Sequence, residues 1–175
     1  MPDSYHPTLD ELTHLERCIA LAAEALEAGD APFGSVLAEN SGAALHEDRN
    51  RIATTGDATR HPEFELARWA AANMTPEARA MATVYTSGEH CAMCSAAHAW
   101  VGLGRIVYVA SATQLEGWTR KWVDEEGAEG KGTRELAVKT LPVQEVVKNI
   151  VVDGPVKELE GEIVRLHRRY AGLDA

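Results

Sequence analysis

The sequence is poor in cysteine, and it contains no long apolar run. Three cysteines occur in 175 residues, too few and too unevenly spread for a disulfide framework. No stretch approaches the roughly 18 uninterrupted apolar residues of a membrane-spanning helix. The first residues, MPDSYHPTLDELTHLE, have neither the basic start nor the apolar core of a signal peptide. These absences predict a protein of a reducing compartment, the cytoplasm, with no membrane partner.

An excess of basic side chains is also missing. The chain has 17 lysines and arginines against 27 aspartates and glutamates, and its formal net charge is -10. Such a balance repels a polyanion unless the basic groups are clustered on one face. The densest basic group, Arg165, Arg168 and Arg169, has the spacing of the polar side of a helix. We therefore expect no nucleic-acid partner.

The length fits one domain with its own core. A chain of 175 residues buries about two thirds of the surface that its unfolded form would expose. The sequence shows no internal repeat and no linker of shifted composition. We predict a single domain over residues 1–175.

The apolar pattern predicts alternating helices and strands. Apolar residues recur at helical spacing from Leu12 to Leu26, and Gly29 follows as a stop, so we predict a long amphipathic helix over residues 8–28. The later predictions are strands over 31–39 and 43–54 joined by the turn ENSG, a helix over 62–74 that is apolar around its circumference and expected to be buried, a strand over 81–87, a helix over 91–103 and a strand over 105–111.

Strands separated by helices of about ten residues pair in parallel, with the helices packed on the sheet. We therefore predict an α/β fold with a mixed sheet. The pattern weakens beyond Ser111, and residues 114–137 show no clean period. Residues 140–152 predict one or two short strands, and residues 155–170 predict a terminal helix.

The stretch EHCAMC places two thiols three residues apart, at the predicted junction of a strand and a helix. Unpaired N–H groups and the helix dipole lower the pKa of thiols at such a position. The triplet HPE, with His61 and Glu63, begins the preceding helix. One imidazole and the thiolates of Cys91 and Cys94 form a three-ligand set for zinc, which leaves the fourth tetrahedral position to water.

Residues two apart on a regular helix point to nearly opposite sides. His61 and Glu63 can therefore share one site only if His61 lies in an irregular opening turn, and Pro62 suits such a turn. Two other interpretations of the cysteine pair stay open. The pair could be a redox dithiol, or His98, one helical turn beyond Cys94, could complete a closed structural zinc site in an interaction module without catalysis.

HPE followed by EHCAMC resembles the HxE and PCxxC signature of the cytidine deaminase superfamily. The segments APFGSVLAE and YTSGEHCAMC, together with Asn50, are most similar to the guanine and cytosine deaminase branch. The resemblance covers residues 12–110. It implies a three-layer α/β/α fold with a mixed five-stranded sheet, and a homodimer with its pockets near the interface.

The resemblance also implies that His61, Cys91 and Cys94 hold zinc and that Glu63 is the proton shuttle. Zinc lowers the pKa of bound water from about 15.7 to about 7, so that a hydroxide is available at neutral pH. Attack on an amino-bearing ring carbon then releases ammonia. The expected substrate is a free nucleobase or a base-like heterocycle, of the guanine, cytosine, isoguanine or s-triazine type. A nucleoside and tRNA adenosine are the alternatives.

Four further residues are candidates for the substrate pocket. Asn50 matches the family's amide that hydrogen-bonds the base, and the alternative is a turn residue whose side chain bonds the backbone. Phe33 is expected to line the pocket. Trp100 stands where guanine deaminases place an aromatic ring against the base, and the alternative is an ordinary core position. Glu89 is expected to orient the loop or the substrate.

The sequence departs from the family pattern at two positions. HPE replaces the usual HAE, and EHC replaces EPC, so that His90 stands where a proline is usual. We expect His90 to place an ionisable donor near the pocket rim. Core positions are predicted for Cys18 and Trp69, and Trp118 and Trp122 are expected to pack the C-terminal part or to cap the pocket. The C-terminal third does not match the family clearly.

Overall fold

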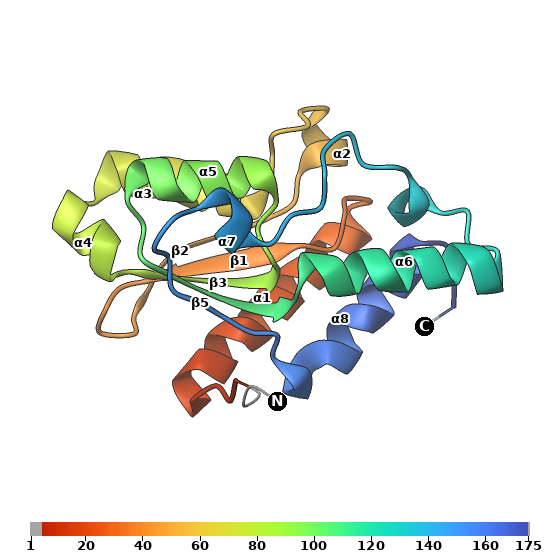
Figure 1. The fold of residues 1–175 in the computed structure, drawn as a ribbon, viewed down its shortest axis with the longest axis horizontal. Helices are drawn as coiled ribbons and strands as arrows, with labels where there is room; N and C mark the ends of the chain where they lie inside the picture. Colours follow the sequence, from red (N-terminus) through yellow and green to blue (C-terminus); the bar gives the residue numbers. More distant parts are fainter. Residues whose placement is uncertain (1–4, 175) are drawn as a thin grey trace.

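The computed structural model describes residues 5–174. Residues 1–4 begin the stretch that is predicted to carry no signal peptide, and they lie outside the described part. The fold is built on a five-stranded sheet with the order β2-β1-β3-β4-β5 (Figure 1). The strands are β1 (Gly34–Ala38), β2 (Ala44–Arg49), β3 (Thr83–Gly88), β4 (Arg105–Ala110) and β5 (Val152–Asp153).

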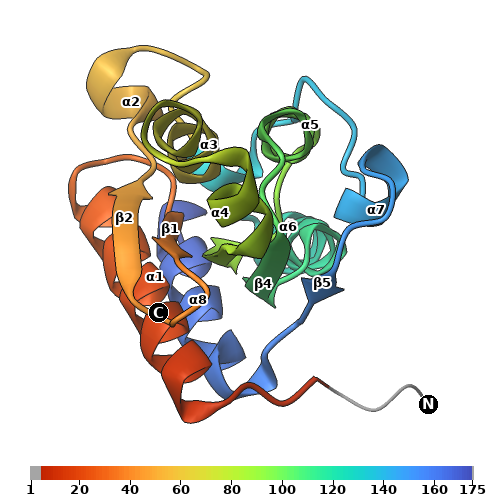
Figure 2. The same cartoon turned by 90° about the vertical axis from the view of Figure 1, so that its left-hand side faces the viewer.

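Helices cover both faces of the sheet (Figure 2). They are α1 (Leu9–Glu27), α2 (Ile52–Thr55), α3 (Pro62–Asn73), α4 (Pro76–Met81), α5 (Ala92–Val101), α6 (Ala112–Glu126), α7 (Val143–Val146) and α8 (Lys157–Tyr170), with a 3₁₀ helix η1 (Lys131–Thr133). The pair α3 and α5 packs on one face, and the pair α1 and α8 packs on the other. Across the described residues, no helix combines the length and the apolarity that crossing a membrane requires.

Strand directions divide the sheet into two parts. β1 pairs antiparallel with both β2 and β3, whereas β3, β4 and β5 run parallel. The parallel part follows from the helices that connect its strands, because a helical crossover returns the chain to the same edge. The predicted mixed five-stranded sheet flanked by helices is confirmed.

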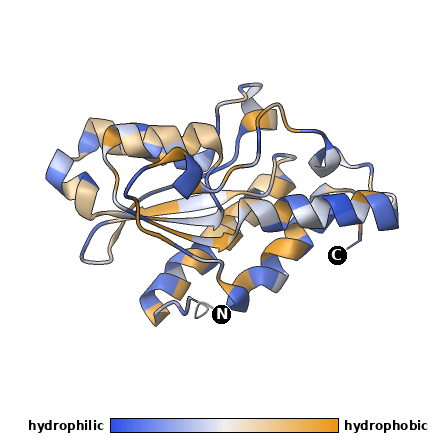
Figure 3. Cartoon of the chain, in the orientation of Figure 1, coloured by the Kyte–Doolittle hydropathy of each residue, from blue (hydrophilic) through white to orange (hydrophobic). Residues whose placement is uncertain are grey.

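Two apolar cores lie on the two faces. One core joins Leu15 and Ile19 of α1 to Val107 of β4 and Ile163 of α8. The other core joins α3 and the loop after α5 to the opposite face, with Leu37, Leu66, Val84 and Leu103. In Figure 3, α5 is coloured mainly as apolar and α6 mainly as hydrophilic. The sheet is therefore the buried middle layer, and α6 lies against solvent.

Gly34 brings α1 close to the start of β1. A Cβ atom on Gly34 would lie 2.4 Å from the Cβ of Leu21 and 2.5 Å from the carbonyl oxygen of Cys18. No side chain fits in that space. Since β1 and β3 are antiparallel, this close packing also fixes Phe33 beside the carboxyl end of β3.

The C-terminal third differs from the prediction. Residues 114–137 gave no periodic pattern, yet α6 covers most of that segment, and a capping box between Ser111 and Gln114 begins it. Residues 143–146 form the short helix α7 where a strand was expected, while the short strand β5 is confirmed. The mainly polar surface of α6 explains why its apolar periodicity is weak.

Three smaller predictions are wrong as well. The strand expected over 43–54 ends at Arg49, and α2 follows it. A helix, α4, precedes β3 and was not expected. The helix α3 was expected to be buried all round, but Leu66, Ala67 and Ala70 are buried while Arg68 is exposed. Its many alanines made it look apolar on every side.

Candidate metal centre and active site

His61, Cys91 and Cys94 meet at the carboxyl end of β3. The Nδ1 atom of His61 lies 3.7 Å from the Sγ atom of Cys91, and the two sulfurs are 3.5 Å apart. All three ligand atoms lie within 4.8 Å of one another. The predicted ligand set is therefore close enough to coordinate a metal ion.

The start of a helix positions each part of this cluster. His61 is the N-cap of α3, with φ -85° and ψ 140°, so its backbone is extended and not yet helical. Pro62 occupies the first helical turn, and Glu63 follows it. This is the irregular opening that the HPE spacing required. Cys91 is likewise the N-cap of α5, and Cys94 lies in the first turn of that helix.

The donor set fits zinc. A tetrahedral zinc ion with Zn–S distances of about 2.3 Å and a Zn–N distance of about 2.0 Å separates its ligand atoms by roughly 3.5–3.8 Å. The two separations measured from Cys91, 3.7 Å to His61 and 3.5 Å to Cys94, agree with that range. The contact with Cys94 lowers the pKa of the Cys91 thiol to about 4, and His61 adds to this effect. Cys91 is therefore held as a thiolate, the form that binds metal.

Glu63 lies next to the ligands and is buried, with 5 % of its surface exposed. Its Oε2 atom is 3.7 Å from the Sγ atom of Cys94, and its Oε1 atom accepts a hydrogen bond of 3.1 Å from the hydroxyl of Thr86. Burial raises the pKa of Glu63, and the nearby Cys91 thiolate raises it further. A carboxyl in this position can accept a proton and release it again.

Two of the predicted pocket residues lie at the same end of the sheet. Asn50 is buried, and its Oδ1 atom accepts from the backbone N–H of Ile52 at 3.1 Å, so the predicted turn role is present. Its own backbone N–H donates to the carbonyl of Phe33 at 2.9 Å. Phe33 is half-buried, and a Cβ atom on Gly88 would lie 2.8 Å from its ring. Phe33 therefore packs directly on the strand end that precedes the cysteines.

Glu89 orients loops. Its Oε2 atom accepts from the backbone N–H of Ala112 and its Oε1 atom accepts from that of Val143, both at 2.9 Å. These two N–H groups begin α6 and α7. One side chain of the motif thus holds two elements of the C-terminal third, and of the two expected roles the loop role matches these contacts.

Trp100 is not brought to the metal cluster. It lies in the last turn of α5, nine residues and about 13 Å of helix beyond Cys91, and 88 % of its surface is exposed. The core alternative for Trp100 is wrong for the same reason. Cys18 is in the core, as predicted. Trp69 is only partly buried and packs against the second core. Trp122 is buried beside Ala128 and Ala171, and Trp118 packs against this group and is partly buried.

His90 is not at a rim. Its exposed fraction is 0 %, its ring packs edge-on against His98 with centroids 5.2 Å apart, and burial lowers its pKa well below the usual value. The expected position at the rim of the pocket is therefore wrong. Both ring nitrogens of His90 are without a hydrogen-bond partner among the described residues.

The closed structural site with His98 as a fourth ligand is also wrong. The Nε2 atom of His98 is 2.9 Å from the carbonyl oxygen of Gly104, and His98 is not part of the ligand cluster. Among the described residues, the group around the cysteines holds three ligands and no fourth. The three cysteines are free thiols.

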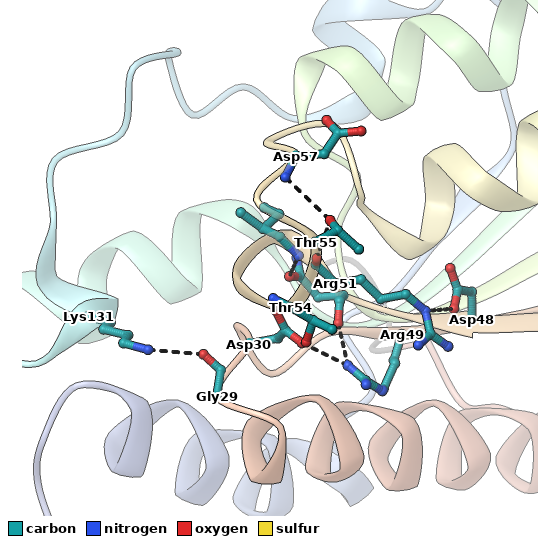
Figure 4. A network of polar contacts seen from close by, with 11 residues as sticks. Gly29, Asp30, Asp48, Arg49, Arg51, Thr54, Thr55, Asp57 and Lys131 are labelled. Atoms are coloured by element: carbon teal, nitrogen blue, oxygen red, sulfur yellow. Dashed lines mark hydrogen bonds and ion pairs between the residues drawn. The ribbon is translucent and has the colours of Figure 1, made fainter.

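Several residues of the site were not predicted. Ser35 and Thr86 lie opposite each other on β1 and β3, and their hydroxyls form a chain that ends on Glu63. Asp30, which is fully buried, forms an ion pair with Arg49 (Figure 4), and Arg49 also donates to the carbonyl oxygen of Asn50. The alternation of a strand could have placed Ser35 and Thr86 on one face, but nothing in the sequence pairs Asp30 with Arg49.

An α/β sheet with one histidine, two cysteines and a buried carboxylate at its edge is typical of zinc-dependent hydrolases that keep an open coordination position. Residues 9–110 match the family model "Cytidine and deoxycytidylate deaminase zinc-binding region". This match covers more than half of the chain. The chain belongs to this zinc-binding deaminase family, and the resemblance inferred from HPE and EHCAMC is confirmed.

Two curated relatives name nucleobases. The chain is 32% identical to a probable cytosine deaminase of Schizosaccharomyces pombe over 113 residues, which are 63% of this chain and 67% of that protein. It is 34% identical to a guanine deaminase of Bacillus subtilis over 102 residues, 58% of this chain and 65% of that protein. The chain thus spans about two thirds of the length of these relatives.

Solved structures share the fold. A guanine deaminase from Nitrosomonas europaea superposes with a TM-score of 0.67 at 16% identity, covering 98% of this chain and 89% of that chain. A structure from work on tRNA:A34 deaminases superposes with a TM-score of 0.60 at 21% identity, covering 89% and 99%. At these identities the likeness extends to the fold alone.

Proposed function

We propose that the protein is a zinc-dependent hydrolytic deaminase of a free nucleobase or a base-like heterocycle of the guanine, cytosine, isoguanine or s-triazine type. The observation that carries the proposal is the position of Glu63. Its buried carboxylate lies 3.7 Å from the sulfur of Cys94, next to a cluster whose ligand atoms lie within 4.8 Å of one another. The names of the two curated relatives support a nucleobase as the substrate.

In the proposed mechanism, His61, Cys91 and Cys94 would hold the metal through one imidazole and two thiolates. Zinc, when bound, supplies a water acidic enough to act as a nucleophile near neutral pH. Glu63 accepts a proton from that water and delivers it to a ring nitrogen of the base. The water oxygen bonds to the amino-bearing carbon, the C–N bond breaks, and the second proton passes through Glu63 to the leaving amino group. The products are the oxo base and ammonia.

The remaining residues bind and orient the substrate. Asn50 offers its Nδ2 amide, which has no acceptor among the described residues, to a carbonyl or ring nitrogen of the base. Phe33 provides an apolar wall. Trp100, which is exposed, is assigned to a homodimer interface rather than to the pocket of its own chain. We assign His90 no contact with the substrate.

A tRNA adenosine substrate is the second candidate, because a tRNA:A34 deaminase structure shares the fold. The charges near the site argue against it. Arg49, Arg51 and Arg60 are paired with Asp30, Asp48 and Glu65. With a net charge of -10, the chain offers a polyanion little attraction. We also infer a single-domain enzyme of the cytoplasm, in keeping with its free thiols.

An ammonia-release assay tests the proposal. Zinc-loaded protein is incubated with purine, pyrimidine and triazine bases, with their nucleosides, and with tRNA. We expect at least one free base to be deaminated with a higher kcat/KM than its nucleoside. Glu63→Gln should lower kcat by at least about 100-fold without loss of zinc. Glu65→Gln changes a half-buried carboxylate of the same helix that pairs with Arg68 and is not part of the cluster, and this variant should stay active. No ammonia from any base would overturn the proposal.

A further inference from the structure

Asp30 is a carboxylate without accessible surface, just after the end of α1. It accepts hydrogen bonds from the Nη1 atom of Arg49 at 2.8 Å, from the backbone N–H of Thr54 at 2.8 Å and from the Thr54 hydroxyl (Figure 4). Burial would raise its pKa, but these donors outweigh that effect and lower it. Asp30 is therefore an ionised, fully bonded group below the surface.

The donors to Asp30 lie on both sides of Asn50. Besides its bond to Asp30, Arg49 Nη1 donates to the carbonyl oxygen of Asn50 at 2.8 Å. Thr54 lies in α2, whose first N–H, from Ile52, donates to the side chain of Asn50. Asp30 therefore binds the segment 49–54 on both sides of Asn50, through Arg49 before it and Thr54 after it. The backbone N–H of Asn50 donates to the carbonyl oxygen of Phe33.

The residue before Asp30 contacts the C-terminal third of the chain. Gly29, next to Asp30, accepts a hydrogen bond from the Nζ atom of Lys131 at 3.2 Å (Figure 4). Lys131 begins η1 in the segment between α6 and α7, and Glu89 holds the beginnings of those two helices. Gly29 and Asp30 therefore connect the Asn50 segment to the C-terminal third.

A contribution to stability does not by itself explain why the ion pair of Asp30 and Arg49 is present. Removing two charges from water costs several kcal/mol, and apolar replacements of buried ion pairs are often neutral or stabilising. A fully bonded ion pair does restrict the backbone that carries its partners, and a small misplacement of a substrate-binding group costs much of its effect. The two partners of Asp30 flank the one residue of this segment that is assigned to the substrate.

We propose that Asp30, through Arg49 and Thr54, is the positioning residue that fixes Asn50 for hydrogen bonding to the heterocycle. The inference rests on the proposed function, because it names the group that prepares the same site. Asp30 itself does not contact the substrate. Its removal should therefore weaken the recognition of the base more than the chemical step.

Asp30→Asn keeps the shape of the side chain and removes the charge. We expect KM for the best free base of the panel to rise about tenfold, while kcat falls less than about threefold and bound zinc is unchanged. Thr54→Val removes one donor from an exposed position and serves if Asp30→Asn does not fold. It should raise KM about threefold. Glu27→Gln, an exposed carboxylate near the end of the same helix, is the matched control and should leave both constants unchanged.

A double-mutant cycle separates positioning from a general structural role. In the Asn50→Ala background, Asp30→Asn should change kcat/KM by less than about twofold, because the residue through which Asp30 acts is gone. An equal loss in the Asn50→Ala background and in the wild type would overturn the proposal. So would a fall in kcat with an unchanged KM.

Hydrogen exchange tests, without any enzymatic reaction, whether Asp30 holds the segment 49–54 in place. The amides of residues 50–56 should exchange at least about tenfold faster in Asp30→Asn than in Glu27→Gln, and unchanged exchange would overturn the proposal. If the wild type deaminates nothing, the proposed function fails by itself. Titration calorimetry with 8-azaguanine then replaces KM as the readout, with a tenfold weaker Kd expected for Asp30→Asn and an unchanged Kd contradicting the positioning role.

Discussion

The hydroxyl of Thr86 on β3 lies 3.1 Å from the Oε1 atom of Glu63 on α3. The hydroxyl of Ser35, on the neighbouring strand β1, donates to the Thr86 oxygen from 2.9 Å. Both Ser35 and Thr86 are without accessible surface. The Thr86 hydroxyl is also 2.9 Å from the carbonyl oxygen of Gly88, so it lies between the end of β3 and the carboxylate that is assigned to proton transfer.

Thr86→Val removes this hydrogen bond while it keeps the shape of the side chain. We expect kcat to fall about tenfold or more with little change in KM, because a hydrogen bond to a charged group is worth about 1.5–3 kcal/mol. Steady-state kinetics at saturating base measure the effect, with zinc content determined in parallel. Thr83→Val, at the far end of the same strand, is the control. An unchanged kcat would show that Glu63 is oriented by other contacts.

Loss of one metal ligand should release zinc. Cys91→Ser is expected to lower the bound zinc from one ion per chain to a small fraction and to abolish deamination, because the affinity depends on all three ligands. Metal analysis after dialysis against a chelator checks this. Cys18→Ala is the matched control, since Cys18 is buried in the core away from the cluster. A Cys91→Ser protein that keeps its zinc would contradict the ligand assignment.

Glu89→Gln should destabilise the fold by about 2 kcal/mol, because its carboxylate accepts from the two N–H groups that begin α6 and α7. An amide can satisfy only one of them as an acceptor. Urea unfolding followed by circular dichroism measures the change. Glu116→Gln removes an exposed carboxylate of α6 and should change the free energy of unfolding by less than about 0.5 kcal/mol. Equal stability of the two variants would argue against the loop role.

Acid should weaken the junction of α1 and β4. Burial would raise the pKa of Glu11, but the backbone N–H of Thr8 and the guanidinium of Arg105 outweigh it and lower the pKa to about 2, from an ordinary 4.5. A lowered folded-state pKa stabilises the protein above about pH 4.5, and the contribution is lost as the pH falls toward 2. Between about pH 6 and pH 2, the wild type should lose about 3 kcal/mol more stability than Glu11→Gln. Urea titrations at each pH measure this difference, and parallel losses would contradict it.

Trp100 should mark a subunit interface. An indole that is 88 % exposed on an apolar helix is a large unfavourable surface unless another chain covers it. We expect Trp100→Glu to convert a homodimer into monomers, as measured by light scattering after size-exclusion chromatography. Val123→Glu, also at an exposed apolar position but on α6, should leave the mass unchanged. A wild-type monomer would contradict the expected homodimer.

The residues of the site that lie at the beginnings of α3 and α5 could be predicted from the sequence. Pro62 limits the opening of α3 to one geometry, so the position of His61 outside the helix and of Glu63 inside it could be foreseen. The same holds for Cys91 at the N-cap of α5. The parallel pairing of β3 and β4 followed from the helix between them. These features depend on local spacing, which the sequence contains.

The errors have several physical causes. The side-chain direction of His90 is set by the space beside His98, and a comparison of motifs carries no information on that space. Trp100 was assigned to a pocket or a core, because apolarity does not distinguish a buried position from an exposed helix end. The ion pair of Asp30 and Arg49 joins residues 19 apart that share no pattern. The helix α6 was missed although its capping box was present at Ser111 and Gln114.

The cluster of His61, Cys91 and Cys94 and the carboxylate of Glu63 come from two neighbouring helix openings, whereas Asn50 and the segment between α6 and α7 come from elsewhere in the chain. Chemistry and recognition are thus encoded in separate stretches. The architecture allows the segment that carries Asn50 to change while the two helix openings that hold the cluster stay the same.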